Sequence, residues 1–293
     1  MTPPLKIGFI GLGAMGEPMA NALLQAGFSV TVCAYRRREA LERLVKAGAT
    51  DGTDPAGVSA ASNVVVICVP DAPQVESVLF AERGVHAGIR SGSLVIDMST
   101  ISPIASKRFA ERLAGSGVAF VDAPVSGGPA RARLATLTIM AGGSPEDFGR
   151  AEPVLKAMGT PYHLGPVGMG ETVKLVNQII ISNVMIANAE ALSFAARAGA
   201  DLEAVRKVIA TATGSNYVLD QWLPKTWFAG TFEGGFAMDL LRKDVAAALD
   251  AARAMGMPMP ATGLAYQLYT ARSAEGDGAL DYSAIAKSYE RIA

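Results

Sequence analysis

The chain has 293 residues, half of them hydrophobic and 18% charged, so it is long enough for two domains with sizeable cores. Its 26 basic and 27 acidic residues nearly cancel, and no block of Lys or Arg suggests a nucleic-acid or anionic-lipid partner. Cys33 and Cys68 lie in apolar runs without metal-ligand spacing, which favours buried thiols over a disulfide. His86 and His163 are isolated from each other and from acidic clusters, so we expect no metal site.

The chain also lacks the patterns of a membrane or exported protein. No apolar run reaches 18 residues without a polar interruption, which argues against a membrane span. The first residues, MTPPLK, lead directly into an apolar run, without the features of a signal peptide. We therefore expect a cytoplasmic protein with no membrane partner.

A glycine motif follows the first apolar run, residues 6–10, and precedes a stretch with helical spacing that ends at Gly27. Strand, glycine turn and helix are the context that the Gly-x-Gly-x-x-Gly fingerprint requires. Its glycines make the turn, let the backbone approach a pyrophosphate, and let the helix pack closely on the strand. We predict a dinucleotide site, rather than an empty glycine turn, formed by Gly11, Leu12, Gly13, Ala14, Met15 and Gly16.

The second apolar run, residues 29–34, ends where an NAD-specific site carries an acidic residue for the ribose. This chain has Tyr35 there, followed by three arginines at 36–38. Because guanidinium groups pair with a 2'-phosphate, Tyr35, Arg36 and Arg37 predict a preference for NADP over NAD. A solvated basic turn is the alternative, since a glutamate that follows could still approach the ribose.

Three further apolar runs, 63–69, 93–98 and 119–121, are typical of parallel strands buried on both faces. A strand is also expected at 136–143, and a helix capped by Ser144 follows it. Alternating strands and helices indicate a doubly wound sheet that binds its ligand at the carboxyl ends of the strands. The loop after the first of these runs therefore contributes Val69, Pro70 and Gln74 to the expected cofactor site.

The loop 122–129 combines a hydroxyl group with unhindered backbone N–H groups at Ser126, Gly127 and Gly128. Such groups can together hold a carboxylate. A plain turn is the competing interpretation.

A long helix is expected over residues 171–197, which contain no Gly or Pro and correspond to about 40 Å of helix. Its middle is apolar on nearly every side, which is typical of a helix buried among other elements. Lys174 is the only positive charge between Met169 and Arg197, and Asn177 and Gln178 follow one turn later. The ordinary interpretation is a lysine whose amine reaches solvent.

These elements predict two domains. The first is a Rossmann-type doubly wound α/β domain over residues 1–165, and the second is an all-α domain over 166–293, joined by the long helix. The roughly 90 residues that follow this helix are too few to bury its apolar surface on all sides. We therefore expect a homodimer, or a tetramer built from such dimers.

Five motifs of the chain together resemble the β-hydroxyacid dehydrogenases, which include 3-hydroxyisobutyrate dehydrogenase and the tartronate, glyoxylate and succinic semialdehyde reductases. The motifs are GFIGLGAMGEPMANAL (8–23), DMSTISP (97–103), DAPVSGG (122–128), GMGETVKLVNQ (168–178) and GGFAMDLLRKD (234–244). The resemblance implies that Lys174 donates or accepts the proton, with Asn177 or Gln178 beside it. It also implies a substrate site at Ser126, Gly127, Gly128 and Phe236, and cofactor contacts from Thr100 and Lys243.

The chain departs from the family pattern in two places. Gln178 stands where many members have Asn, and Arg131 and Ala135 stand where the family often has Gly. We therefore expect a substrate loop of different shape, in which Arg131 could contact an acidic substrate.

The function expected from these motifs is NADP- or NAD-dependent oxidation of a small 3-hydroxyacid, or reduction of the matching semialdehyde, with Lys174 as general acid and base. Activity like that of 3-hydroxyisobutyrate dehydrogenase or tartronate semialdehyde reductase is the leading interpretation. A glyoxylate or succinic semialdehyde reductase is an alternative. A non-catalytic NADP-binding module is a second alternative, against which the intact lysine argues. An imine reductase is expected to have Asp or Tyr in place of Lys174.

Overall fold

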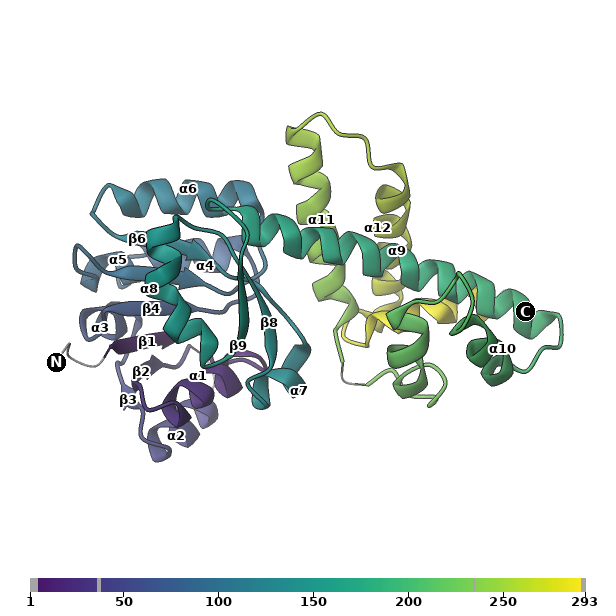
Figure 1. Ribbon diagram of the computed structural model, residues 1–293, viewed down its shortest axis with the longest axis horizontal. Helices are drawn as coiled ribbons and strands as arrows, with labels where there is room; N and C mark the ends of the chain where they lie inside the picture. The colour runs from purple at the N-terminus through teal and green to yellow at the C-terminus, as the bar shows by residue number, and fades with distance from the viewer. Residues whose placement is uncertain (1–4, 36–37, 234, 291–293) are drawn as a thin grey trace. The chain divides into compact units, whose positions relative to one another are not determined.

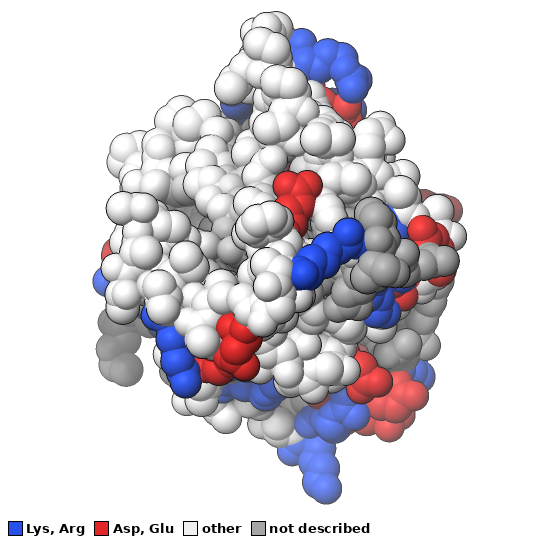
Figure 2. Space-filling model, turned by 90° about the vertical axis from the view of Figure 1, so that its right-hand side faces the viewer, with Lys and Arg blue, Asp and Glu red and all other residues white. Residues whose placement is uncertain are grey.

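The computed structural model describes residues 5–35, 38–233 and 235–290 of the chain (Figure 1). The chain forms two compact units, Met1–Lys174 and Leu175–Ala293. On the face drawn in Figure 2, Lys and Arg are interspersed with Asp and Glu, and the described residues form no continuous basic surface there. The domain boundary expected at residue 165 remains a prediction.

The first unit is built on a six-stranded parallel sheet in the order β3-β2-β1-β4-β5-β6. Its strands are β1 (Lys6–Ile10), β2 (Ser29–Cys33), β3 (Thr50–Asp51), β4 (Val64–Ile67), β5 (Leu94–Asp97) and β6 (Ala119–Asp122). The chain leaves β1 in one direction and returns to its other side at β4, which is the switch point at which doubly wound folds bind dinucleotides. The predicted Rossmann-type fold is confirmed.

Eight helices connect the strands of the first unit in its described part. They are α1 (Gly16–Gln25), α2 (Glu39–Lys46), α3 (Pro55–Ala60), α4 (Ala72–Phe80), α5 (Val85–Gly88), α6 (Pro103–Ala114), α7 (Gly128–Arg133) and α8 (Pro145–Lys156). Several begin with a capping side chain followed by proline, which needs no N–H partner in a first turn. Ser144, for example, accepts from Asp147 N at 3.0 Å, as the sequence predicts.

A separate three-stranded sheet completes the first unit. It pairs β7 (Val125–Ser126) antiparallel to β8 (Leu137–Ala141), and β8 parallel to β9 (Gly159–His163). The strand predicted at 136–143 is therefore present, but in this small sheet. The sequence did not predict β9, because it contains Pro161 and mostly exposed or half-exposed residues and has no apolar run.

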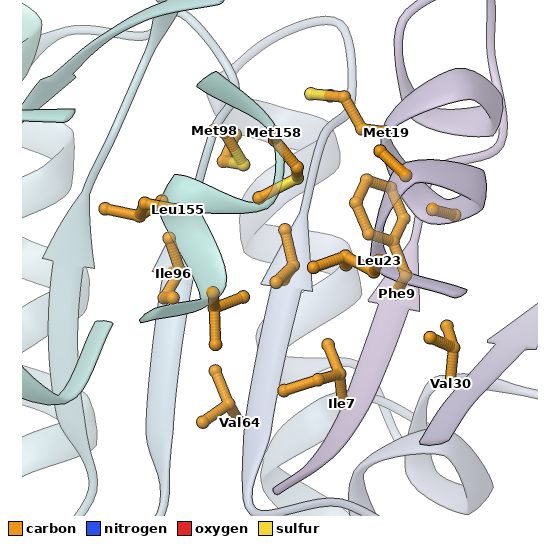
Figure 3. Packing of buried hydrophobic residues seen from close by; sticks show 14 of the residues in the cluster. Ile7, Phe9, Met19, Leu23, Val30, Val64, Ile96, Met98, Leu155 and Met158 are labelled. Carbon is orange, nitrogen blue, oxygen red and sulfur yellow. The ribbon is translucent and has the colours of Figure 1, made fainter. Parts of the chain in front are cut away.

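Two hydrophobic clusters cover the two faces of the large sheet. Along β4, Val64 and Val66 pack into one cluster, whereas Val65 and Ile67 pack into the other. Figure 3 shows the first cluster, in which Phe9 of β1 lies beside Leu23 of α1. Because alternate residues of a strand point to opposite faces, burial of both faces explains the continuous apolar runs in the sequence.

The regular secondary structure of the second unit, in its described residues, is helical apart from an isolated bridge between Ala237 and Asp281. It contains most of α9 (Met169–Arg197), followed by α10 (Leu202–Ile209), α11 (Met238–Ala254), α12 (Pro260–Arg272), α13 (Lys287–Glu290) and four short π or 3-10 segments. Its core includes Met185 of α9 and Tyr269 of α12. The predicted all-α region is confirmed.

The long helix α9 is not covered on all sides within one chain. Val176, Ile180 and Phe194 are 47%, 55% and 76% exposed. By length and composition alone α9 qualifies as a candidate membrane span, and only 28% of its most apolar window is buried. The expectation of an all-round buried helix is therefore wrong for a single chain.

The face of α9 that is buried is mostly polar in its first half, with Leu175 as a buried apolar residue. Its buried positions follow helical spacing and include Glu171, Lys174, Gln178 and Ser182 before the apolar Met185. Burying polar groups is costly unless they are paired, whereas leaving apolar groups in water is also unfavourable. This helix therefore has polar groups, including the predicted Lys174 and Gln178, on its buried face and an exposed apolar surface on its outer face.

Candidate active site

The carboxyl ends of four adjacent strands lie side by side at one end of the large sheet. Ile10 of β1, Ile67 of β4, Asp97 of β5 and Asp122 of β6 are register neighbours in that order. The loops that follow them therefore start side by side. These loops carry the predicted glycine motif, the residues Val69 and Pro70, Thr100, and the substrate loop at 126–128.

The three glycines of the first motif have three different environments. Gly11 has φ +103°, and a Cβ there would lie 2.1 Å from Cys68 O. A Cβ on Gly16 would lie 1.8 Å from Gly11 O, because α1 begins against the turn. A Cβ on Gly13 would meet no protein atom within 4 Å.

Leu12, Ala14 and Met15 complete this turn, and Met15 makes no side-chain cap to α1. No side chain of Met15 therefore caps the start of α1, and no protein atom lies within 4 Å of a Cβ position on Gly13. A helix N-terminus of this kind favours a phosphate group, so the residues present fit a dinucleotide.

The end of β2 is the region expected to distinguish NADP from NAD. Tyr35 is highly exposed, and Arg38 pairs with Asp51 at 3.3 Å. Arg36 and Arg37, on which the predicted preference depends, lie outside the described residues. The preference therefore stays a prediction.

Hydrogen bonds connect the loops that follow β4 and β5. Val69 N donates to Ser99 Oγ at 3.0 Å, and Ser99 N donates to Asp97 Oδ1 at 3.0 Å. The half-buried Thr100 follows Ser99, while Pro70 and Gln74 are exposed near the start of α4. The loop that bears Thr100 is thus held to the ends of β4 and β5 by these two hydrogen bonds.

The predicted substrate loop is shaped by strand pairing and by two glycines. Ser126 is held in β7 opposite Thr138 of β8. Gly127 and Gly128 follow with φ +132° and +65°, which side chains rarely adopt. The stem of Arg131 lies against Gly127, where a Cβ would be 2.8 Å from the Arg131 Cβ and Cδ atoms.

The first turn of α9 is bound to the end of β6 by Asp122. The Asp122 carboxylate accepts hydrogen bonds from Gly168 N at 2.7 Å and Glu171 N at 2.9 Å. Burial raises the pKa of Asp122 to about 6, although hydrogen bonds from Gly168 and Glu171 act in the opposite direction. This carboxylate caps the helix that carries the predicted catalytic lysine.

Lys174 is buried, with 7% of its surface exposed. Lys174 is therefore not an exposed residue on the surface of α9. Glu171, one turn earlier on the same face, is fully buried, and its Oε2 accepts from Ile101 N at 3.1 Å. The sequence reasoning missed Glu171, although an acid three residues before a singular lysine was a visible signal.

In the second unit, a chain of polar contacts joins α9 to α11. Asn177 Nδ2 donates to Gln178 Oε1 at 2.9 Å, and Gln178 Nε2 donates to Asp244 Oδ2 at 2.6 Å. Lys243 pairs with the other oxygen of Asp244 at 2.7 Å. The sequence reasoning also missed the buried Asp244, which directly follows Lys243 in the fifth motif.

Phe236 lies in the loop before α11 and is held by Asp281. Its backbone N donates to Asp281 Oδ2 at 2.9 Å, and Trp222 Nε1 donates to Asp281 Oδ1 at 3.0 Å. The Phe236 ring packs edge-on against Tyr282. Among the described residues, no group of three or more His, Cys, Asp and Glu side chains could hold a metal ion.

Two family models together match residues 6–289 of the chain. Residues 6–174 match the NAD-binding domain of 6-phosphogluconate dehydrogenase, and residues 168–289 match the NAD-binding model of NADP-dependent 3-hydroxyisobutyrate dehydrogenase. The chain is 39% identical to 2-(hydroxymethyl)glutarate dehydrogenase of Eubacterium barkeri, covering 100% of this chain and 97% of that protein. The chain belongs to the β-hydroxyacid dehydrogenase family.

Other members of the β-hydroxyacid dehydrogenase family agree with this assignment. The chain is 39% identical to 2-hydroxy-3-oxopropionate reductase of Escherichia coli, covering 99% of this chain and 98% of that protein. A structure of 3-hydroxyisobutyrate dehydrogenase from Mycobacterium tuberculosis with L-serine matches with a TM-score of 0.89 and 30% identity, over 97% of this chain and 99% of that one. The chain is accordingly an NAD(P)-dependent oxidoreductase.

Proposed function

We propose that this enzyme interconverts a small carboxylated 3-hydroxyacid and its semialdehyde, with Lys174 as the general acid and base. The observation that carries the proposal is a single lysine, 7% exposed, on a helix whose first turn is tied to the ligand-binding edge of a Rossmann sheet. Relatives of similar length are named for a hydroxymethyl dicarboxylate and for 2-hydroxy-3-oxopropionate.

The bound nicotinamide cofactor supplies or accepts the hydride. In the reductive direction, the Lys174 ammonium donates a proton to the carbonyl oxygen as negative charge develops on it. In the oxidative direction, the neutral amine removes the proton from the hydroxyl group. Gln178, one helical turn further, is proposed to keep the substrate or the amine in line, with Asn177 as its hydrogen-bond partner.

The substrate carboxylate is proposed to bind at Ser126, Gly127 and Gly128. A hydroxyl group and backbone at positive φ can surround an anion without side-chain hindrance, and a Cβ on Gly128 would meet no protein atom within 4 Å. Thr100, Lys243 and Phe236 keep the cofactor and substrate roles that the family resemblance implies.

NADP is the proposed cofactor. Of the three arginines that follow Tyr35, Arg38 already pairs with Asp51. The proposal therefore rests on Arg36 and Arg37, whose guanidinium groups suit a 2'-phosphate. Replacing both with Ala is expected to lower the ratio of NADPH to NADH turnover.

We further propose that residues 166–293 form the substrate and dimerisation domain, and that two copies associate through the apolar surface of α9. Val176 and Ile180 are about half exposed in one chain, and contiguous apolar surface on a protein commonly marks an interaction site. A dimer, or a tetramer of such dimers, would cover it.

The experiment follows the loss of nicotinamide absorbance with NADPH and NADH in parallel, against tartronate, methylmalonate and succinic semialdehydes. Turnover of at least one semialdehyde, faster with NADPH, is the expected result. Faster turnover with NADH would overturn the cofactor proposal alone. If both cofactors bound and none of the three semialdehydes were reduced, the proposed substrate class would be wrong.

A further inference from the structure

Glu171 is a carboxylate buried between two loops and the first turn of α9. Its Oε2 accepts from Ile101 N at 3.1 Å, and its own backbone N donates to Asp122 Oδ2 at 2.9 Å. The residue is completely buried. A buried carboxylate has a high desolvation cost unless specific contacts stabilise it, so these contacts are needed to keep Glu171 in this position.

Its contact with Ile101 bears on the loop that carries Thr100. That loop begins at the end of β5, where Ser99 is bound to Asp97 and to Val69. Glu171 binds the same loop from the side of α9. The carboxylate therefore connects the loop after β5 directly to the helix that carries Lys174.

Glu171 also lies one turn before Lys174 on the same face of α9. Residues three apart on a helix are neighbours, and a helical side chain leans toward the N-terminus, so Lys174 leans toward the turn of Glu171. Glu171 is fully buried and Lys174 is 7% exposed, so solvent ions screen a charge on one from the other only weakly.

Other charged groups surround this turn, but each has a different role. Asp122 accepts the backbone N–H groups of Gly168 and Glu171, and the Asp97 Oδ1 atom accepts from Ser99. Lys107 of α6 is exposed, and its stem lies against Gly168. Of the acidic residues among these, Glu171 is the one on the helical face of Lys174.

We propose that Glu171 is a positioning residue with two effects: it holds the Thr100 loop against α9, and its charge keeps Lys174 protonated to higher pH. The inference rests on the proposed role of Lys174. A nearby carboxylate stabilises an ammonium group relative to the neutral amine. The site is thereby adapted to donate a proton, which is the requirement of the reductive direction.

Two substitutions separate the two effects. Glu171→Gln removes the charge but retains a side-chain oxygen that can accept from Ile101 N. Glu171→Asp retains the charge but is one methylene shorter, so it no longer reaches Ile101 N in the same geometry. Glu111→Gln, at an exposed position on α6, is the matched control for loss of one negative charge.

The measurement is kcat for semialdehyde reduction as a function of pH, with saturating NADPH and with the best of the three semialdehydes. In Glu171→Gln, the loss of activity at high pH is expected to move about one pH unit or more toward acid. In Glu171→Asp, the profile is expected to keep its midpoint while kcat falls, and Glu111→Gln is expected to match the wild type.

Unchanged pH midpoints in Glu171→Gln would overturn the electrostatic effect, and unchanged kcat in Glu171→Asp would overturn the positioning effect. Thermal unfolding checks that each variant is folded. If Glu171→Gln does not fold, a shift in the midpoint of the pH profile of Glu171→Asp counts against the proposal. Failure of these tests in an enzyme that still requires Lys174 leaves the proposed function intact. If the enzyme does not require Lys174, both the proposed function and the proposed role of Glu171 are wrong.

Discussion

Gly13 and Gly16 belong to one motif, yet the structure assigns them to different tasks. Gly13 faces open space, whereas Gly16 lies against Gly11 O and the Phe9 ring. Gly13 is therefore expected to matter for ligand binding, and Gly16 for the packing of α1 against β1.

Gly13→Ala is expected to weaken NADPH binding by about 10-fold or more, because its methyl group would occupy space needed by the pyrophosphate. Its free energy of unfolding should match that of the wild type, since no protein atom opposes the added methyl group. Gly16→Ala is expected to destabilise the fold itself. Cofactor titration and urea unfolding of both variants test this division, and equal loss of stability in the two would contradict it.

The residues that support the site were harder to predict than the residues that form it. Lys174 could be singled out because its motif is local in the sequence. Asp122 and Asp244 act through partners that are 49 and 66 positions away, at Glu171 and Gln178, and no local pattern records such pairs. Burial of these acids is a consequence of tertiary structure, so it became visible only when the elements were placed.

The start of α9 depends on one carboxylate from another element. The fully buried Asp122, at the end of β6, accepts from the backbone N–H of Gly168, just before α9, and from that of Glu171 in its first turn. Burial raises its pKa from 3.8 to about 6. The native state therefore binds more protons than the unfolded state between these values.

It follows that the contribution of Asp122 to the free energy of unfolding is largest below pH 4 and is lost as pH rises through about 6. The expected loss is about 3 kcal/mol for a shift of about two pH units. Asp122→Asn removes this titration. Urea unfolding of both proteins from pH 4 to pH 7 should show a steeper fall in the wild type, and parallel curves would contradict this assignment.

The extent of α9 followed from the sequence, but its orientation did not. Absence of Gly and Pro predicted a helix over 171–197, close to the observed Met169–Arg197. Apolar residues on nearly every side concealed which face is buried, because the inner face is mostly polar in its first half and the outer face includes Val176 and Ile180. Periodicity cannot identify the inner face when both faces contain apolar residues.

At the scale of the whole molecule, we propose that a second copy of the chain covers the outer face of α9. Sedimentation analysis at micromolar concentration should give at least twice the 30.3 kDa mass of one chain. Ile180→Glu is expected to shift the protein toward monomer, because it places a charge on the apolar surface. Val45→Glu, on an exposed apolar residue of α2, is the control.

A monomeric wild type would rule out the dimer. An Ile180→Glu variant with the wild-type mass would place the interface elsewhere.

The central claim is that the buried Lys174 carries the proton in a nicotinamide-dependent reaction. The most direct measurement is turnover of Lys174→Ala with NADPH and the best semialdehyde, together with its affinity for NADPH. Lys156→Ala, at an exposed lysine of α8 that pairs with Glu152, is the control. We predict that Lys174→Ala binds NADPH as the wild type does while kcat falls about 100-fold or more. Turnover close to that of the wild type would contradict the account.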